Sequence, residues 1–228
     1  YFQYFLYLTY LVLPSVPTVI FGMFPCQNVD GQEEDQYYLR HDLSLSCSSE
    51  RYTTGVTIAA VMILVYPFGI PAFYYWQLFL HRDLIRHRSL DGKSGSIRDI
   101  AAKYGFLYES YEPRFWYWES VEAIRRIVMT GVVSVLSPSS STQSVAGMIL
   151  ALVYIGLYGQ LKPYEDDKDD HLAFVGQYQI FWTFFGTLVI GNGLLGSKQD
   201  NTVAVFIIIG NLAVFILGAF YEIADYRH

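Results

Sequence analysis

Long apolar segments separated by short charged ones are the dominant pattern of this 228-residue sequence. Five stretches contain no Asp, Glu, Lys or Arg, and each exceeds the roughly 20 apolar residues that a membrane-spanning helix needs. One buried helix of a soluble protein can be apolar all round, but five in so short a chain would expose too much apolar surface. The pattern therefore predicts an integral membrane protein. The stretches are residues 1–29, 52–80, 127–161, 172–197 and 201–221.

The stretch 127–161 is too long for one span, and a polar turn from Ser137 to Gln143 interrupts it. Such a turn ends one helix and caps the next. The predicted fold is an all-α, polytopic membrane helix bundle of about six transmembrane helices. The third contains four charged residues in its first turns, and without it the count is five. The predicted spans are about 3–24, 55–80, 118–136, 144–161, 171–195 and 202–222, with an outside loop at 25–53 and an inside loop at 81–117.

Basic residues set the expected orientation, because Lys and Arg are enriched on cytoplasmic loops. With six spans, twelve of the 15 Lys and Arg lie on the side that holds both termini. The other side keeps Arg40, Arg51 and Lys198. We therefore expect both termini and the loops 81–117 and 162–170 to be cytoplasmic, in a chain that resides in the plasma membrane. Five spans would place the C-terminus outside.

Composition supports a membrane domain and excludes some partners. Hydrophobic residues make up 53% of the chain and charged residues 16%, against roughly 25% charged in soluble domains. The net charge of −6 and the lack of a basic domain exclude a nucleic-acid partner. Residues 1–228 are interpreted as a single transmembrane domain. Because the sequence opens on Tyr1 rather than Met, we expect it to be a fragment of a longer protein.

The chain has two cysteines, Cys26 and Cys47, and both lie in the predicted outside loop. In an oxidising compartment such a pair commonly closes a disulfide. The alternative is two independent small apolar side chains, but neither cysteine lies in an apolar stretch. The sequence favours the disulfide.

The inside loop contains apolar residues at helical spacing between Ile97 and Tyr108. This spacing predicts a short amphipathic helix along the inner membrane surface. A solvated linker is the alternative. The five histidines are scattered, and no metal-binding, nucleophile or phosphate-loop motif is present. No catalytic residue, metal site or cofactor is predicted, and the chain is not expected to be an enzyme.

The most informative segment is the start of the third span. It opens with an aromatic run typical of an interfacial belt, followed by charges at membrane depth, which by default mark a functional site. Glu122 is spaced to pair with Arg125 or Arg126 within the helix. Three interpretations stay open: a structural ion-pair network, an anionic-lipid headgroup site, and a gating or permeation element. The belt is Phe115, Trp116, Tyr117 and Trp118, and the charge cluster is Glu119, Glu122, Arg125 and Arg126.

Two further features are candidates for function. The second inside loop is acidic, and it is interpreted as a solvated loop that caps the fifth helix; a counter-charge to the arginines and a weak divalent-ion site are the alternatives. Pro67, Gly69 and Pro71 predict a kink or hinge in the second helix. The amides Gln177, Gln179, Asn192 and Asn211 join helices or line a pore. The acidic residues are Glu165, Asp166, Asp167, Asp169 and Asp170.

Several motifs, in order along nearly the whole chain, resemble one known domain. The motifs are Phe24-Pro25-Cys26, Tyr38-Leu39-Arg40, Leu43 to Cys47, Tyr66 to Pro71, Phe106 to Glu109 continuing to Thr130-Gly131, Lys162-Pro163-Tyr164, and Leu172-Ala173 with Gln177. With these motifs, the sequence resembles the transient-receptor-potential-like C-terminal transmembrane domain of very large surface proteins of protists, algae and water moulds.

The resemblance implies a multi-span domain that carries a large extracellular part upstream and is related to cation channels. The first functional hypothesis is therefore a channel-like or sensory membrane domain. The alternative is a passive anchor for an adhesive or enzymatic ectodomain. The expected partners are the lipid bilayer and anionic lipid headgroups, and a homo-oligomer is compatible with either hypothesis.

Overall fold

The computed structural model describes residues 2–13, 15–28, 37–87, 95–133, 140–193, 202–214 and 216. The chain is mostly helical and divides into two compact units, Tyr1–Pro138 and Ser139–His228. Each unit is described by itself.

The first unit begins with two short helices, α1 (Phe2–Val12) and α2 (Ser15–Phe21). The sequence predicted one helix over residues 3–24. The break follows from the sequence around it, because Pro14 has no amide hydrogen and disfavours helical geometry in the residue before it. Pro17 is tolerated in the first turn of α2, where amide hydrogens have no partner within the helix.

A three-stranded antiparallel sheet follows in the predicted outside loop, so the all-α expectation is corrected here. Its strands are β1 (Cys26–Asn28), β2 (Tyr37–Leu39) and β3 (Asp42–Ser46), in sequence order. The short strands gave too little alternation to be predicted. The Cys26–Cys47 disulfide is confirmed, and it joins the first strand to the residue after the last.

Replacing both Cys26 and Cys47 with Ser should lower the stability of the first unit. The bond closes a loop with a sequence separation of 21 residues, for which the chain-entropy account gives about 3 kcal/mol. Thermal unfolding of the purified chain in detergent, with and without reductant, measures the effect. The reductant should shift the wild-type midpoint and leave that of the double variant unchanged; an equal shift in both would contradict the prediction.

The second predicted span is one continuous helical stretch, Glu50–Leu80, long and apolar enough to cross a membrane. It consists of α3 (Glu50–Ile63), the π-helical segment η1 (Leu64–Phe68) and α4 (Gly69–Leu80). Ser49 caps its start by accepting a hydrogen bond from the Tyr52 amide. Pro67 lies inside the π-helical segment.

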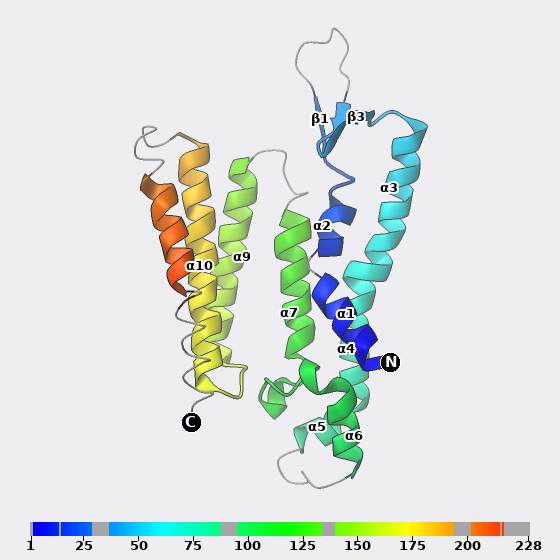
Figure 1. The fold of residues 1–228 in the computed structure, drawn as a ribbon, viewed down its shortest axis with the longest axis vertical. Coiled ribbons are helices and arrows are strands. Elements are labelled where there is room, and N and C mark those ends of the chain that lie inside the picture. Colours follow the sequence, from blue (N-terminus) through cyan, green and yellow to red (C-terminus); the bar gives the residue numbers. More distant parts are fainter. Residues whose placement is uncertain are drawn as a thin grey trace. The chain divides into compact units, whose positions relative to one another are not determined.

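In its described residues, 81–87 and 95–117, the predicted inside loop holds four short helical segments at the α4 end of the unit (Figure 1). The predicted amphipathic helix is present as α6, and it packs against α1. Its last residue, Tyr104, joins Tyr74, Leu78, Leu107 and Trp116 in a buried apolar cluster. The segments are α5 (Arg82–Arg86), α6 (Gly95–Tyr104), η2 (Gly105–Leu107) and η3 (Pro113–Phe115).

In the described part of the first unit, α7 (Trp118–Ile127) follows and continues into a second π-helical segment, η4 (Val128–Val132). α7 packs against α4, and η4 packs against α2. The three helical stretches of the unit therefore run alongside one another, with the sheet at one end and α5 and α6 at the other (Figure 1).

The second unit is an antiparallel hairpin of α9 (Ser140–Leu161) and α10 (Asp167–Gly191), followed by the helix Thr202–Val214. Gln179 of α10 donates a hydrogen bond to Asn211 of the last helix, as expected for amides that join membrane helices. At the open end of the hairpin, Ser141 donates to Asn192 at 3.0 Å.

Within the described ranges, three helices are long and apolar enough to cross a membrane: Glu50–Leu80, Ser141–Leu161 and Asp167–Gly191. The helix Thr202–Val214 is apolar but shorter. Of the other predicted spans, the first is divided into α1 and α2. The third is described to residue 133, as α7 and η4, and carries four charges.

Candidate functional site

Glu122 and Arg125 form one of the two ion pairs of the charge cluster on α7. Oε2 of Glu122 accepts hydrogen bonds from Nε and Nη2 of Arg125, at 3.0 and 2.8 Å. The Glu122 side chain is only 2% exposed. The helix spacing of three residues predicted this pair, and the structure contains it.

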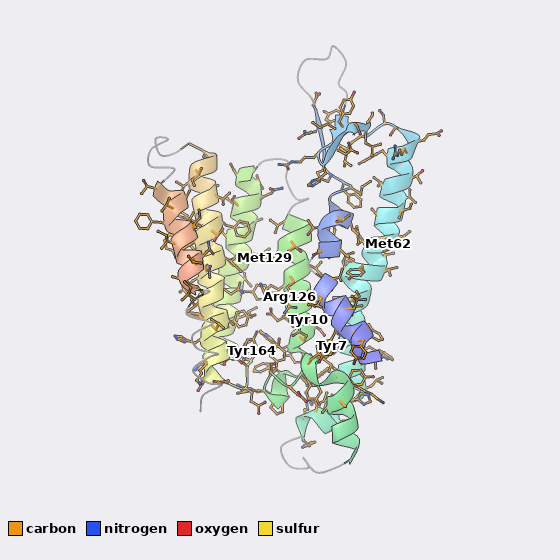
Figure 2. The ribbon with its side chains drawn as sticks, viewed as in Figure 1. Tyr7, Tyr10, Met62, Arg126, Met129 and Tyr164 are labelled. Atoms are coloured by element: carbon orange, nitrogen blue, oxygen red, sulfur yellow. A yellow bond between two sulfur atoms is a disulfide. The ribbon has the colours of Figure 1, made fainter. Side chains whose placement is uncertain are left out.

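Arg126 makes a different ion pair from the one its spacing suggested. Its Nη1 lies 3.3 Å from Oε1 of Glu119, two helical turns earlier, and the Glu119 side chain is 4% exposed. Its Nη2 donates a hydrogen bond to the hydroxyl of Tyr10 at 3.0 Å. The guanidinium also lies over the Tyr10 ring, 4.8 Å from its centre, in a cation–π contact (Figure 2).

Tyr111 completes the network from the segment that precedes α7. Its hydroxyl donates to the second oxygen of Glu119, Oε2, at 2.7 Å. Glu119 and Arg126 thus connect α1, the segment between η2 and η3, and α7 through charge-assisted hydrogen bonds. Sequence analysis missed Tyr10 and Tyr111, because their contacts depend on the fold and tyrosine is common throughout the chain.

A second set of hydrogen bonds fastens α1 to α4. The Thr9 hydroxyl donates to the backbone carbonyl of Leu6 at 2.8 Å and can accept a hydrogen bond from the Tyr74 hydroxyl, which lies 2.8 Å away and 3.4 Å from the same carbonyl. Tyr74 is almost fully buried. α1 is therefore held on both sides by polar contacts.

The two ion pairs of the cluster bear on whether it is an internal network or a site for anionic lipid headgroups. Two arginines are matched by two buried glutamates on the same helix, so the positive charge is already compensated. An anionic headgroup would have to compete with the carboxylates of Glu119 and Glu122, which the helix already holds beside the arginines. The geometry favours an internal ion-pair network over a headgroup site.

The aromatic run lies mostly inside the protein. Phe115, Trp116 and Trp118 are buried, and Tyr117 is half-buried. Trp116 packs against the rings of Tyr75 and Phe79 on α4. A lipid-facing belt requires exposed rings, and three of these four are buried. Through Trp116, the run packs the segment just before α7 against α4.

The acidic segment is partly helical rather than a loop, because α10 begins at Asp167. Asp166 caps it by accepting a hydrogen bond from the Lys168 amide at 2.9 Å, as the capping interpretation expected. Asp170 is buried and accepts from the Tyr164 amide at 3.0 Å. In the described part of the chain, no three acidic, histidine or cysteine side chains are grouped to hold a metal ion. Glu165 and Asp169 are exposed.

Comparison with known proteins gives the family. A sequence model of the transient receptor potential (TRP) ion channel family matches residues 42–221, most of the chain. The chain belongs to the TRP ion channel family. The match covers α7 and its charge cluster, together with all three membrane-length helices.

One similar protein and one negative result complete the comparison. Cysteine repeat modular protein A of Toxoplasma gondii is 24% identical over 206 residues. The match covers 85% of this TRP chain but 6% of that protein, so the chain spans a small part of its relative's length. No solved structure matches.

Membership in the TRP family and the membrane-length helices together describe a channel-like integral membrane domain. The family is one of ion channels and not of enzymes.

Proposed function

We propose that this chain is a gated, cation-conducting membrane domain, and that α7 with its charge cluster couples the gate to the inner segments. The single observation that carries the proposal is the buried network of Glu119 and Arg126 with Tyr10 and Tyr111. Ionised groups inside a spanning region are costly and usually functional. Here they join three separate elements of the first unit.

The proposed topology has six spans, with both termini and the 81–117 segment in the cytoplasm. The proposed location is the plasma membrane. It is supported by the distribution of Lys and Arg. The course of the first unit supports it as well, since the start of α1, the end of α4 and the start of α7 all lie at the α5 and α6 end (Figure 1). The disulfide lies at the opposite end, as an oxidising exterior favours.

Selectivity for cations is supported by the charge of the proposed outer segment. Residues 25–53 contain six acidic side chains and two arginines. A negative surface potential raises the local concentration of cations and lowers that of anions. The same segment is the proposed point of coupling to an extracellular region upstream. Within it, the disulfide joins the first strand to Cys47, three residues before α3 begins.

The passive anchor remains the second candidate, because the chain matches 6% of a much longer relative. An anchor needs membrane-length helices but no coupling between α1 and α7. The two candidates therefore predict different outcomes when that coupling is weakened in a folded domain.

Replacing Tyr10 with Phe should shift gating while leaving the domain folded. The change keeps the ring over Arg126 but removes the hydroxyl that accepts its hydrogen bond. A hydrogen bond to a charged group contributes about 1.5 kcal/mol, so the open–closed equilibrium should move roughly tenfold. Current in patched liposomes as a function of membrane tension measures the shift.

The matched control is Tyr4→Phe, which removes a hydroxyl from an exposed tyrosine of the same helix. Its tension response should equal that of the wild type. Identical responses of the Tyr10 and Tyr4 variants would reject coupling through the network. Absence of current from folded wild-type protein, verified by circular dichroism and size-exclusion chromatography, would favour the anchor.

A further inference from the structure

All three helical stretches of the first unit depart from regular α-helix geometry. The first is divided, since α1 ends at Val12 and α2 begins at Ser15. The other two each contain a π-helical segment of five residues, Leu64–Phe68 and Val128–Val132. Segments of this kind are rare and frequently occur at functional sites.

These irregular segments contact one another through α2, which packs against both η1 and η4. The ring of Phe21, at the end of α2, lies directly against Gly131 of η4, where a side chain would collide with it. Phe21 and Tyr66 of η1 both pack on a buried cluster of Leu13, Ala123 and Ile127. Three irregularities that are far apart in the sequence therefore form one layer.

Local chemistry accounts for the π-helical segment η1. Pro67 has no amide hydrogen to donate, and its ring would collide with the carbonyl of Ile63 in a regular α-helix. Widening the turn relieves the collision.

The cause is different at η4, which contains no proline. The hydroxyl of Thr130 donates to the backbone carbonyl of Arg126 at 2.7 Å and competes with the helix amides. The same bond at Thr183, to the carbonyl of Gln179, leaves α10 regular. The added factors at η4 are Gly131 and the Phe21 ring pressed against it. Because Arg126 belongs to the charge network, the Thr130 hydrogen bond links η4 directly to that network.

We propose that η1, η4 and the α1–α2 break form one hinge layer, across which the sheet-bearing part of the first unit moves against the part that holds the charge network. The motion is an exchange between π and α turns in η1 and η4, coordinated by α2, which touches both. It deepens the proposed function, because it names how the outer segment acts on Arg126. It requires neither current nor any particular ion.

Hydrogen–deuterium exchange of the chain in lipid nanodiscs, resolved by peptide mass spectrometry, tests the hinge directly. Amides of 64–68 and 128–132 should exchange about tenfold faster than those of the flanking α segments 55–63, 69–80 and 118–127, because they open locally. Uniform protection along these stretches would overturn the proposal. Since the readout is backbone opening, it is independent of whether the domain conducts.

Coordination between the two segments is tested by Pro67→Ala, which lets η1 return to an α turn. Exchange should fall about tenfold in 64–68 and also fall in 128–132, which is distant in sequence. The matched control is Pro113→Ala, which removes a proline from the first residue of η3 and should leave both 64–68 and 128–132 unchanged. A fall confined to 64–68, or an equal effect of both variants, would overturn the coordination.

A second variant approaches the layer from η4 and does not depend on Pro67→Ala folding. Thr130→Val removes the hydroxyl that bonds the Arg126 carbonyl, and it should slow exchange in both 128–132 and 64–68. Thr183→Val removes the equivalent bond in the regular α10 and should slow neither. Unchanged exchange in 64–68 upon Thr130→Val would show that the segments open independently and would overturn the single hinge.

Discussion

Arg126→Ala should be among the most destabilising single substitutions in the first unit. It would leave Glu119, whose side chain is 4% exposed, without its ionic partner, and it would remove the donor that holds Tyr10 of α1. Breaking a buried ion pair by deleting one partner costs about 3 kcal/mol or more, because a desolvated charge remains. Thermal or denaturant unfolding of the purified domain in detergent measures the loss.

The control is Arg114→Ala, because Arg114 pairs with Glu112 at the surface, where the two side chains are 64% and 37% exposed. Exposed pairs contribute less than about 1 kcal/mol. The double variant Glu119→Gln with Arg126→Gln removes both charges and should recover part of the stability lost in Arg126→Ala. Equal losses for Arg126→Ala and Arg114→Ala would contradict the account of a buried network.

Gly147→Leu should separate α9 from α10 in the second unit. Three ring atoms of Phe184 lie 2.6–2.7 Å from the position of a Cβ at residue 147, closer than any real side chain tolerates. To admit the leucine, the Phe184 ring must shift or the helices must move apart, at a cost of about 1–3 kcal/mol for overpacking. The midpoint of thermal unfolding should fall, and contact between the two helices, measured by cross-linking, should weaken.

Gly156→Leu provides the comparison within the same helix. No atom lies within 4 Å of a Cβ at that position, and leucine is the better helix former by roughly 1 kcal/mol. Its unfolding midpoint should equal or exceed that of the wild type. If both glycine variants are equally destabilised, close packing at Gly147 is not what holds the hairpin together.

The long helices could be predicted from the sequence because membrane solvation acts on each segment separately. An uncharged run such as 52–80 has to satisfy its own backbone hydrogen bonds, so helix is the only outcome there. The Cys26–Cys47 bond and the Glu122–Arg125 pair were predictable for the same reason, since loop position and helix spacing are local properties.

Contacts between distant segments were not predictable in this way. Nothing around Tyr10 indicates that its hydroxyl meets Arg126, 116 residues later. The spacing rule offered Glu122 as the partner of Arg126, but Glu122 is occupied by Arg125, and Arg126 extends back to Glu119. The burial of Trp116 and Trp118 also depends on α4, whose position no local pattern gives.

The π-helical segments were missed for a third reason. Pro67 predicted an irregularity in the second helix, but prolines are compatible with a kink, a break or a widened turn. At 128–132 the sequence contains no breaker except Gly131, and its effect arises from the ring of Phe21 on another helix. Hinges that depend on packing between helices therefore become visible only in the fold.

The most direct test of the central claim is the reversal potential of single-channel currents from the purified domain in patched liposomes. Tension is applied under asymmetric potassium, calcium and chloride, and folding is verified on the same preparation. Gated cation conduction predicts unitary currents that reverse near the equilibrium potential of a cation. Currents that reverse at the chloride potential, or silence from folded protein over the full range of tension, would contradict it.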